Sequence, residues 1–212
     1  MKDEMKMLQV LDMSGVTELP SKAFWGNGNS ETYMQSIPAK AFYEKLTLQQ
    51  VIFPACLEQI EYRAFLGCSN LFTIDFPEAS NLKIIGESAF SGCSGLQALD
   101  LSGNTSLIEI GSSAFSSCYK LKSVDLSGCS SLQSINYDGF GHCTSLQSVN
   151  LSNCTSLQKI GNSGFEYCSA LQEVDLSNCS QLTSIGNNAF SSSNSILKTV
   201  RLSECSALQT IG

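Results

Sequence analysis

Cysteine and histidine are the residues of this chain that could support nucleophilic or metal-dependent chemistry. The chain contains ten cysteines but a single histidine, His142, which directly precedes Cys143. A thiol and an imidazole that face each other can act as nucleophile and base. Clustered thiols can bind zinc or form disulfides. Whether these side chains converge depends on the elements that carry them.

The spacing of the cysteines points away from a zinc or redox cluster. None of them forms a C-x-x-C pair, the spacing typical of such sites. Most fall instead into two columns with a 25-residue step: Cys68, Cys93, Cys118, Cys143 and Cys168 form the first, and Cys129, Cys154 and Cys179 the second. A free cysteine behaves as a small buried hydrophobe, so we interpret both columns as inward-facing ladders. Occasional disulfides between neighbouring positions remain open, because adjacent coils would bring them near bonding distance.

The pair of His142 and Cys143 does not have the arrangement of a catalytic dyad. Cys143 should point inward with its column, whereas His142 occupies a slot that other repeats fill with glycine, serine or tyrosine. A nucleophile and its base must face each other. No glycine-rich phosphate-binding motif is present either. We therefore predict that the chain is not an enzyme and has no catalytic, cofactor-binding or metal-binding residues.

Apolar residues recur at the same 25-residue step as the cysteines. Their pattern predicts the secondary structure that carries the two cysteine columns. Phenylalanine recurs at Phe65, Phe90, Phe115, Phe140, Phe165 and Phe190. The consensus unit is L-x-x-V-x-L-S-x-C-x-x-L-x-x-I-G-x-x-A-F-x-x-C-x-x. Its V-x-L segment alternates like a short strand with one buried face, and no stretch has the 3.6-residue period of a longer helix. Units this short bury their apolar residues only by stacking on one another.

The pattern therefore predicts a single repeat solenoid over residues 1–212, with about eight repeats. Looser units of 18 and 23 residues precede the regular 25-residue units, and residues 25–33 should interrupt the array. We expect one parallel β-sheet face, an opposite face of irregular short turns, and little helix. The chain stops within a repeat, at "LQTIG", so we expect a fragment of a longer protein.

A glycine column follows the isoleucine column of the repeat. Its members are Gly86, Gly111, Gly161 and Gly186. Asn136 replaces glycine in one repeat, and Asn is the substitution that a left-handed turn tolerates. The column therefore suggests such a turn. Pro38 and Glu61 hold this slot in earlier repeats, and proline cannot adopt positive φ, so some coils must turn differently.

Charge and hydropathy argue against two classes of partner. The formal net charge is -7 and only 15% of residues are charged. Binding to nucleic acid needs clustered Lys and Arg for the phosphates, so we expect no nucleic-acid partner. The apolar runs are only a few residues long, so we expect no membrane span in this chain. No secretory signal is visible at its N-terminus.

The repeat resembles that of known proteins. The L-x-x-V-x-L-x-x-C/N segment resembles leucine-rich repeats, and the I-G-x-x-A-F-x-x-C continuation is similar to the BspA-like subfamily. This resemblance implies a right-handed leucine-rich-repeat-type solenoid with the V-x-L strands on one face. It also implies a location on the cell surface or outside the cell, where members of the subfamily attach to molecules of a host or a neighbouring cell.

The outward positions of the strands form the candidate binding face. The residue between the two buried strand positions belongs to one outward column, made of Asp75, Asp100, Asp125, Asn150, Asp175 and Arg201. A second outward column contains Ser102, Ser127, Ser152 and Ser177. Stacked carboxylates repel one another unless water screens them or serine hydroxyls hydrogen-bond them. The acidic column is either such a solvated face or a strip that binds cations or basic side chains.

The repeat pattern favours a non-catalytic protein-interaction module, and the resemblance implies that this module is the binding region of a cell-surface or secreted adhesin. Its partner would be a protein or glycan of a host or neighbouring cell. An intracellular leucine-rich repeat scaffold is the alternative, since reduced cysteines suit that compartment. A more remote alternative is an ice- or surface-binding array, although serine and aspartate stand where such a face would be rich in threonine. The oligomeric state stays open.

Overall fold

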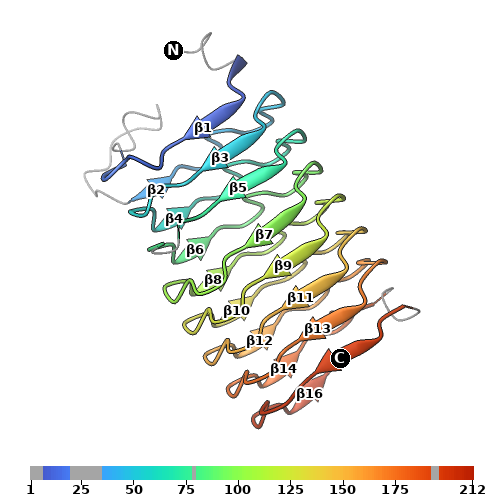
Figure 1. The fold of residues 1–212 in the computed structure, drawn as a ribbon. Helices are drawn as coiled ribbons and strands as arrows, with labels where there is room; N and C mark the ends of the chain where they lie inside the picture. Colours follow the sequence, from blue (N-terminus) through green and yellow to red (C-terminus); the bar gives the residue numbers. More distant parts are fainter. Residues whose placement is uncertain (1–6, 20–34, 78–79, 192–195) are drawn as a thin grey trace.

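The computed structural model describes residues 7–19, 35–77, 80–191 and 196–212, and the chain winds through them as a stack of short coils. Figure 1 shows β1 and β16 at opposite ends of an elongated solenoid, with the strands of successive coils side by side. The interruption expected at residues 25–33 lies outside the described residues.

Each coil contributes one three-residue strand and one two-residue strand. The longer strands are β1 (Val10–Asp12), β3 (Gln50–Ile52), β5 (Thr73–Asp75), β7 (Ala98–Asp100), β9 (Ser123–Asp125), β11 (Ser148–Asn150), β13 (Glu173–Asp175) and β15 (Thr199–Arg201). The shorter strands are β2 (Ser36–Ile37), β4 (Gln59–Ile60), β6 (Ile84–Ile85), β8 (Glu109–Ile110), β10 (Ser134–Ile135), β12 (Lys159–Ile160), β14 (Ser184–Ile185) and β16 (Thr210–Ile211). The described residues contain no α-helix.

The longer strands pair in parallel with the register that the repeat predicts. Val149 of β11 lies between Val124 of β9 and Val174 of β13. These residues are buried, whereas their neighbours in each strand are half-buried or exposed. The prediction of a parallel β-solenoid built on the V-x-L segment is therefore confirmed.

The face expected to consist of irregular turns carries a second parallel sheet. The two-residue strands form one continuous eight-stranded sheet in the order β16-β14-β12-β10-β8-β6-β4-β2. Ile135 and Ile160 are Cα partners in this sheet, and both are buried. Because only two residues per coil pair here, the segment is too short for the alternation that identifies a strand in sequence.

The longer strands form two sheets rather than one, and the break falls between β5 and β7. One sheet has the order β1-β3-β5 and the other the order β15-β13-β11-β9-β7. In regular coils the residue after each longer strand adds one more backbone hydrogen bond to the neighbouring coil. For example, the N–H of Leu101 donates to the carbonyl of Asp125 at 2.9 Å. The amide of Phe76, which follows β5, makes no such bond within the described ranges.

The core is a set of buried columns that run along the solenoid. Phe42, Phe65, Phe90, Phe115, Phe140, Phe165 and Phe190 stack in chain order with ring centroids 5.0 to 5.5 Å apart. The planes of neighbouring rings differ by 9° or less. The inward phenylalanine column is therefore one continuous stack, as the 25-residue step predicts.

The glycine column does not form the left-handed turn, so that prediction is wrong. Left-handed φ angles occur two residues later, for example at Ser88 (55°) and Ser113 (53°). Glycine is needed for a different reason, the close approach of successive coils. A Cβ added at Gly111 would lie 2.7 Å from the carbonyl carbon of Gly86 and from the amide nitrogen of Glu87.

Candidate functional site

The first thiol column is part of the core rather than a reactive cluster. The Sγ atom of each cysteine lies within hydrogen-bond distance of the carbonyl oxygen of a phenylalanine in the preceding coil. This distance is 3.2 Å from Cys93 to Phe65 and 3.2 Å from Cys143 to Phe115. Burial raises the pKa of the Cys68 thiol to about 12 and that of Cys93 well above its ordinary value. These thiols are therefore protonated near neutral pH and are poor nucleophiles.

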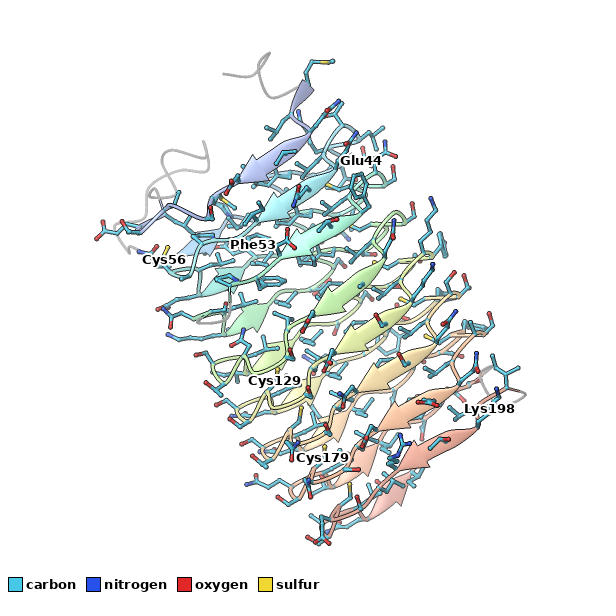
Figure 2. All side chains as sticks on the ribbon, viewed as in Figure 1. Glu44, Phe53, Cys56, Cys129, Cys179 and Lys198 are labelled. Atoms are coloured by element: carbon cyan, nitrogen blue, oxygen red, sulfur yellow. The ribbon has the colours of Figure 1, made fainter. Side chains whose placement is uncertain are left out.

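The second thiol column follows the same rule with leucine carbonyls. Cys129 donates to the carbonyl of Leu101 at 3.1 Å, and Cys179 donates to that of Leu151 at 3.2 Å. Figure 2 labels these two cysteines, which come from coils two repeats apart. Burial raises the pKa of both thiols to about 12. All ten cysteines lie in the described part of the chain, and none is in a disulfide.

His142 and Cys143 are not brought together. His142 is exposed, and its ring stacks on Tyr167 of the next coil with centroids 4.7 Å apart. Cys143 is buried on the other side of the backbone, in the thiol column. Across residues 7–19, 35–77, 80–191 and 196–212, no three His, Cys, Asp or Glu side chains gather in a way that could hold a metal ion.

The acidic column forms a single row over most of its length. Asp125 of β9 is the Cα partner of Asp100 and of Asn150, and Asp175 of β13 is the Cα partner of Asn150 and of Arg201. We call the side chains of Asp100, Asp125, Asn150, Asp175 and Arg201 the strand row. Asp75 belongs to the other sheet, where it is the partner of Ile52.

The strand row also has a structural task that sequence reasoning missed. One Oδ atom of Asp100, of Asp125 and of Asp175 accepts the backbone N–H of the serine two residues later, each at 2.9 Å. Asn150 accepts the equivalent bond from Ser152 at 3.1 Å. These bonds hold the turn that leaves each strand, and the D-x-S spacing in the sequence was the signal for them.

Asp175 has an additional partner at the C-terminal end of the row. Its carboxylate lies 3.9 Å from the guanidinium of Arg201. Partial burial raises the pKa of Asp175, but the hydrogen bonds from Ser177 and the charge of Arg201 outweigh it, so the pKa lies below its ordinary value. The row is therefore charged near neutral pH at this position, with one cation beside it.

A polar cleft lies at the break between the two sheets of longer strands, beside β5 and β7. Its volume is about 300 Å³, and its lining includes Asp75, Pro77, Asp100 and Asn104. Two departures from the repeat mark it in the sequence. Pro77 stands where later coils have a serine, and Asn104 stands where they have a cysteine. The sequence predicts a binding surface on the strand face alone, so this cleft is an addition to it.

Among the described residues, no helix has the length and hydropathy that a membrane-spanning segment needs.

Comparison with known proteins supports the repeat assignment. The family model described as "BspA type Leucine rich repeat region" matches residues 35–153 and 104–212, with six copies of the repeat. Among curated protein sequences, none matches the chain significantly.

Solved structures with a similar fold include three bacterial proteins. Pneumococcal vaccine antigen PcpA is 18% identical with a TM-score of 0.52, and the match covers 96% of this chain and 62% of PcpA. The T. pallidum leucine-rich repeat protein is 25% identical with a TM-score of 0.45, covering 78% of each chain. A leucine-rich cell surface protein of Faecalibacterium prausnitzii is 16% identical with a TM-score of 0.42, covering 96% of this chain and 87% of that one.

The family model spans most of the chain, and its repeat coincides with the stacked coils and with the phenylalanine and cysteine columns. The chain therefore belongs to the BspA-type leucine-rich repeat family.

Proposed function

We propose that the chain is the binding region of a cell-surface or secreted adhesin, a non-catalytic module that holds a protein partner against its strand row. The family supports the coarser part of this proposal, a protein-interaction repeat module. The resemblance to BspA-like proteins supports the surface location.

The observation that carries the proposal is the regular spacing of charge along the strand row. Asp100, Asp125 and Asp175 stand on strands of one sheet, and their carboxylates are fixed by the serine amides. Side chains that are already ordered lose little conformational entropy when a partner binds. Three fixed carboxylates beside a single Arg201 favour a basic partner segment that crosses the strands.

The inward columns and the loops offer less to a partner. The thiol and phenylalanine columns are buried from Phe65 to Phe165. The turns that leave the longer strands consist mainly of serine, glycine and asparagine. A broad rigid surface is what a solenoid usually presents to an extended partner.

The test starts from an array of purified extracellular matrix proteins and cell-surface glycans, probed with the wild-type chain. Binding of any captured protein is then compared between wild type and the double variant Asp125→Asn/Asp175→Asn. Asparagine keeps the Oδ atom that holds the turn, as Asn150 does, but it removes the charge. We expect the double variant to bind about tenfold more weakly, because two charge contacts are lost.

The matched control is Glu87→Gln/Glu166→Gln, which changes the net charge by the same amount away from the strand row. It should bind as wild type does. Equal loss in both variants would mean that only net charge matters, and no loss in the Asp variant would reject the strand row as the contact surface.

An intracellular scaffold remains the second candidate, and one observation favours it. The chain has ten cysteines and no disulfide among them, which is usual for proteins of reducing compartments. Fractionation of cells that produce the full-length protein decides between the two, because surface protease treatment would digest an adhesin and spare a scaffold.

A further inference from the structure

Four asparagines of the chain begin an N-x-S/T sequence, the acceptor sequence for an N-linked glycan. They are Asn104, Asn150, Asn153 and Asn178. A chain rich in asparagine and serine contains such sequences by chance, so the sequence alone does not select among them. The structure places the four side chains in different surroundings, and these surroundings decide which asparagine can carry a glycan in the folded protein.

Two of the four asparagines are poorly placed for a glycan. Only 4% of the surface of Asn104 is exposed, so a glycan on its amide would have to enter the core. Asn150 is half-buried in β11, between its Cα partners Asp125 and Asp175. A glycan there would be confined between two carboxylates that are themselves held by serine amides.

Asn153 and Asn178 occupy the same position of successive coils, on the turn that leaves each longer strand. Both are exposed, and both have a left-handed φ of 62°. Asparagine is among the residues that adopt this conformation most readily. The hydroxyl residues that complete the two acceptor sequences, Thr155 and Ser180, are exposed as well. A bulky group on either asparagine would therefore project from the surface.

The hydrogen bond between these two side chains favours Asn153 over Asn178. The Nδ2 atom of Asn178 donates to the Oδ1 atom of Asn153 at 2.9 Å, so the nitrogen that would carry its glycan faces a neighbour. Within the described ranges, the Nδ2 atom of Asn153 makes no hydrogen bond. The preceding coil has Gly128 at this position and offers no side chain, whereas Asn178 lies between Asn153 and Glu204.

We propose that Asn153 is the attachment site of an N-linked glycan. The inference rests on the proposed surface or secreted location, because this modification occurs on exported chains. The donor would be an oligosaccharide linked to a polyprenyl diphosphate. A bond forms between the Nδ2 atom of Asn153 and the anomeric carbon of the first sugar, and Nδ2 loses one proton. The bond from that carbon to the diphosphate oxygen breaks, and the lipid diphosphate leaves with the electron pair.

A glycan on Asn153 is compatible with the contacts of the turn. The glycosylated amide keeps its carbonyl oxygen, so Oδ1 still accepts from Asn178. The backbone N–H of Asn153 donates to the carbonyl of Ser177 at 2.8 Å and is not involved in the transfer. Asn153 lies three residues after Asn150, so the glycan would stand at the edge of the strand row rather than on it.

The test secretes the whole chain from a eukaryotic host that supplies the donor and the transferase. The folded, secreted protein is treated with peptide N-glycosidase F in H₂¹⁸O, which converts each glycosylated asparagine to ¹⁸O-labelled aspartate. Mass spectrometry of the peptides then locates the label. We expect label at position 153 in most molecules, less at position 178, and none at position 104.

Variants of the acceptor sequence identify the site independently. Asn153→Gln removes the acceptor nitrogen, and Thr155→Ala removes the hydroxyl while Asn153 remains. Each should abolish the loss of gel mobility that one glycan causes, whereas Thr155→Ser should retain it. Asn178→Gln, in the adjacent coil, is the matched control and should be glycosylated like wild type at position 153. Thermal melting shows that each variant is folded.

The same peptide mapping on the full-length protein from the cells that produce it separates this proposal from the proposed location. A protein that is exposed at the surface but has no label at position 153 would overturn the glycan and leave the adhesin proposal standing. An unlabelled protein that stays inside the cells would overturn both. In the secretion host, more label at position 150 or 178 than at position 153 would reject the assignment to Asn153.

Discussion

The rings of Phe140 and Phe165 are parallel, with an interplanar angle of 0° and centroids 5.1 Å apart. Residues 25 positions apart in the sequence thus become neighbours along the stack axis. Both rings are completely buried. The relationship repeats along the array, so each phenylalanine in its interior is packed on both faces by its equivalents.

Truncation of a ring inside this stack should be strongly destabilising. Phe140→Ala removes a buried ring and its contacts with Phe115 and Phe165, and we expect it to lower the free energy of unfolding by about 3–5 kcal/mol. Urea unfolding followed by circular dichroism measures the change. Phe140→Leu should cost clearly less, and a loss under about 1 kcal/mol for the alanine variant would mean that the stack adds little to stability.

The buried thiols should make the protein sensitive to alkali. The pKa of Cys68, Cys129 and Cys179 is about 12 in the folded chain, against an ordinary value of 9.0. Between these values the unfolded chain releases protons that the folded chain keeps, so stability is full below pH 9 and falls as the pH rises toward 12. The expected slope is up to about 1.4 kcal/mol per pH unit for each such thiol.

Replacement of buried cysteines by alanine provides the control for the loss of stability at alkaline pH. In Cys129→Ala/Cys154→Ala/Cys179→Ala the decline of stability above pH 9 should be shallower than in wild type, whatever the stability at neutral pH. Urea midpoints at several pH values measure both slopes. Identical slopes would show that the buried thiols do not cause the alkaline loss.

The aspartates of the strand row should stabilise the fold through an oxygen atom rather than through charge. Asp125→Ala removes the acceptor of the Ser127 amide and should cost about 0.5–1.5 kcal/mol. Asp125→Asn keeps an acceptor, as Asn150 does naturally, and should be nearly neutral. Thermal melting of the two variants distinguishes them, and an equal loss in both would assign the stabilisation to charge.

The glycine column should be intolerant of a methyl group because of contact between coils. A Cβ at Gly161 would lie 2.6 Å from the carbonyl carbon of Asn136 and 2.7 Å from the amide nitrogen of Tyr137. We expect Gly161→Ala to cost about 1–3 kcal/mol in urea unfolding. Gly15→Ala is the control, since nothing lies within 4 Å of its added Cβ. A tolerated Gly161→Ala would mean that the coils separate easily at this point.

The regular part of the fold could be predicted from the sequence because residues 25 positions apart occupy equivalent places in successive coils. This equivalence determines both the register of the strands and which side chains are buried. Once Val124 and Val149 are recognised as equivalent, their pairing in a parallel sheet follows, and so does the inward direction of the thiol and phenylalanine columns. Their burial needs no information beyond the repeat.

The rest of the fold and the candidate sites were less predictable. They depend on backbone geometry and on positions where the sequence departs from the repeat. The two-residue strands are too short to show a period, as Ser134–Ile135 illustrates. The left-handed residues Ser88 and Ser113 are not of the type that usually marks positive φ. The cleft arises where Pro77 and Asn104 depart from the repeat beside a broken ladder, and only the folded chain brings these departures together.

The charge of the strand row is proposed to bind the partner, and this is the central claim to test. The decisive measurement is the Kd of the wild-type chain and of Asp125→Asn/Asp175→Asn for the same captured protein over a range of sodium chloride concentrations. We predict that wild-type binding weakens as salt screens the row, and that the double variant binds more weakly at low salt with a flatter dependence. Equal Kd values with equal salt dependence for the two proteins would contradict the account.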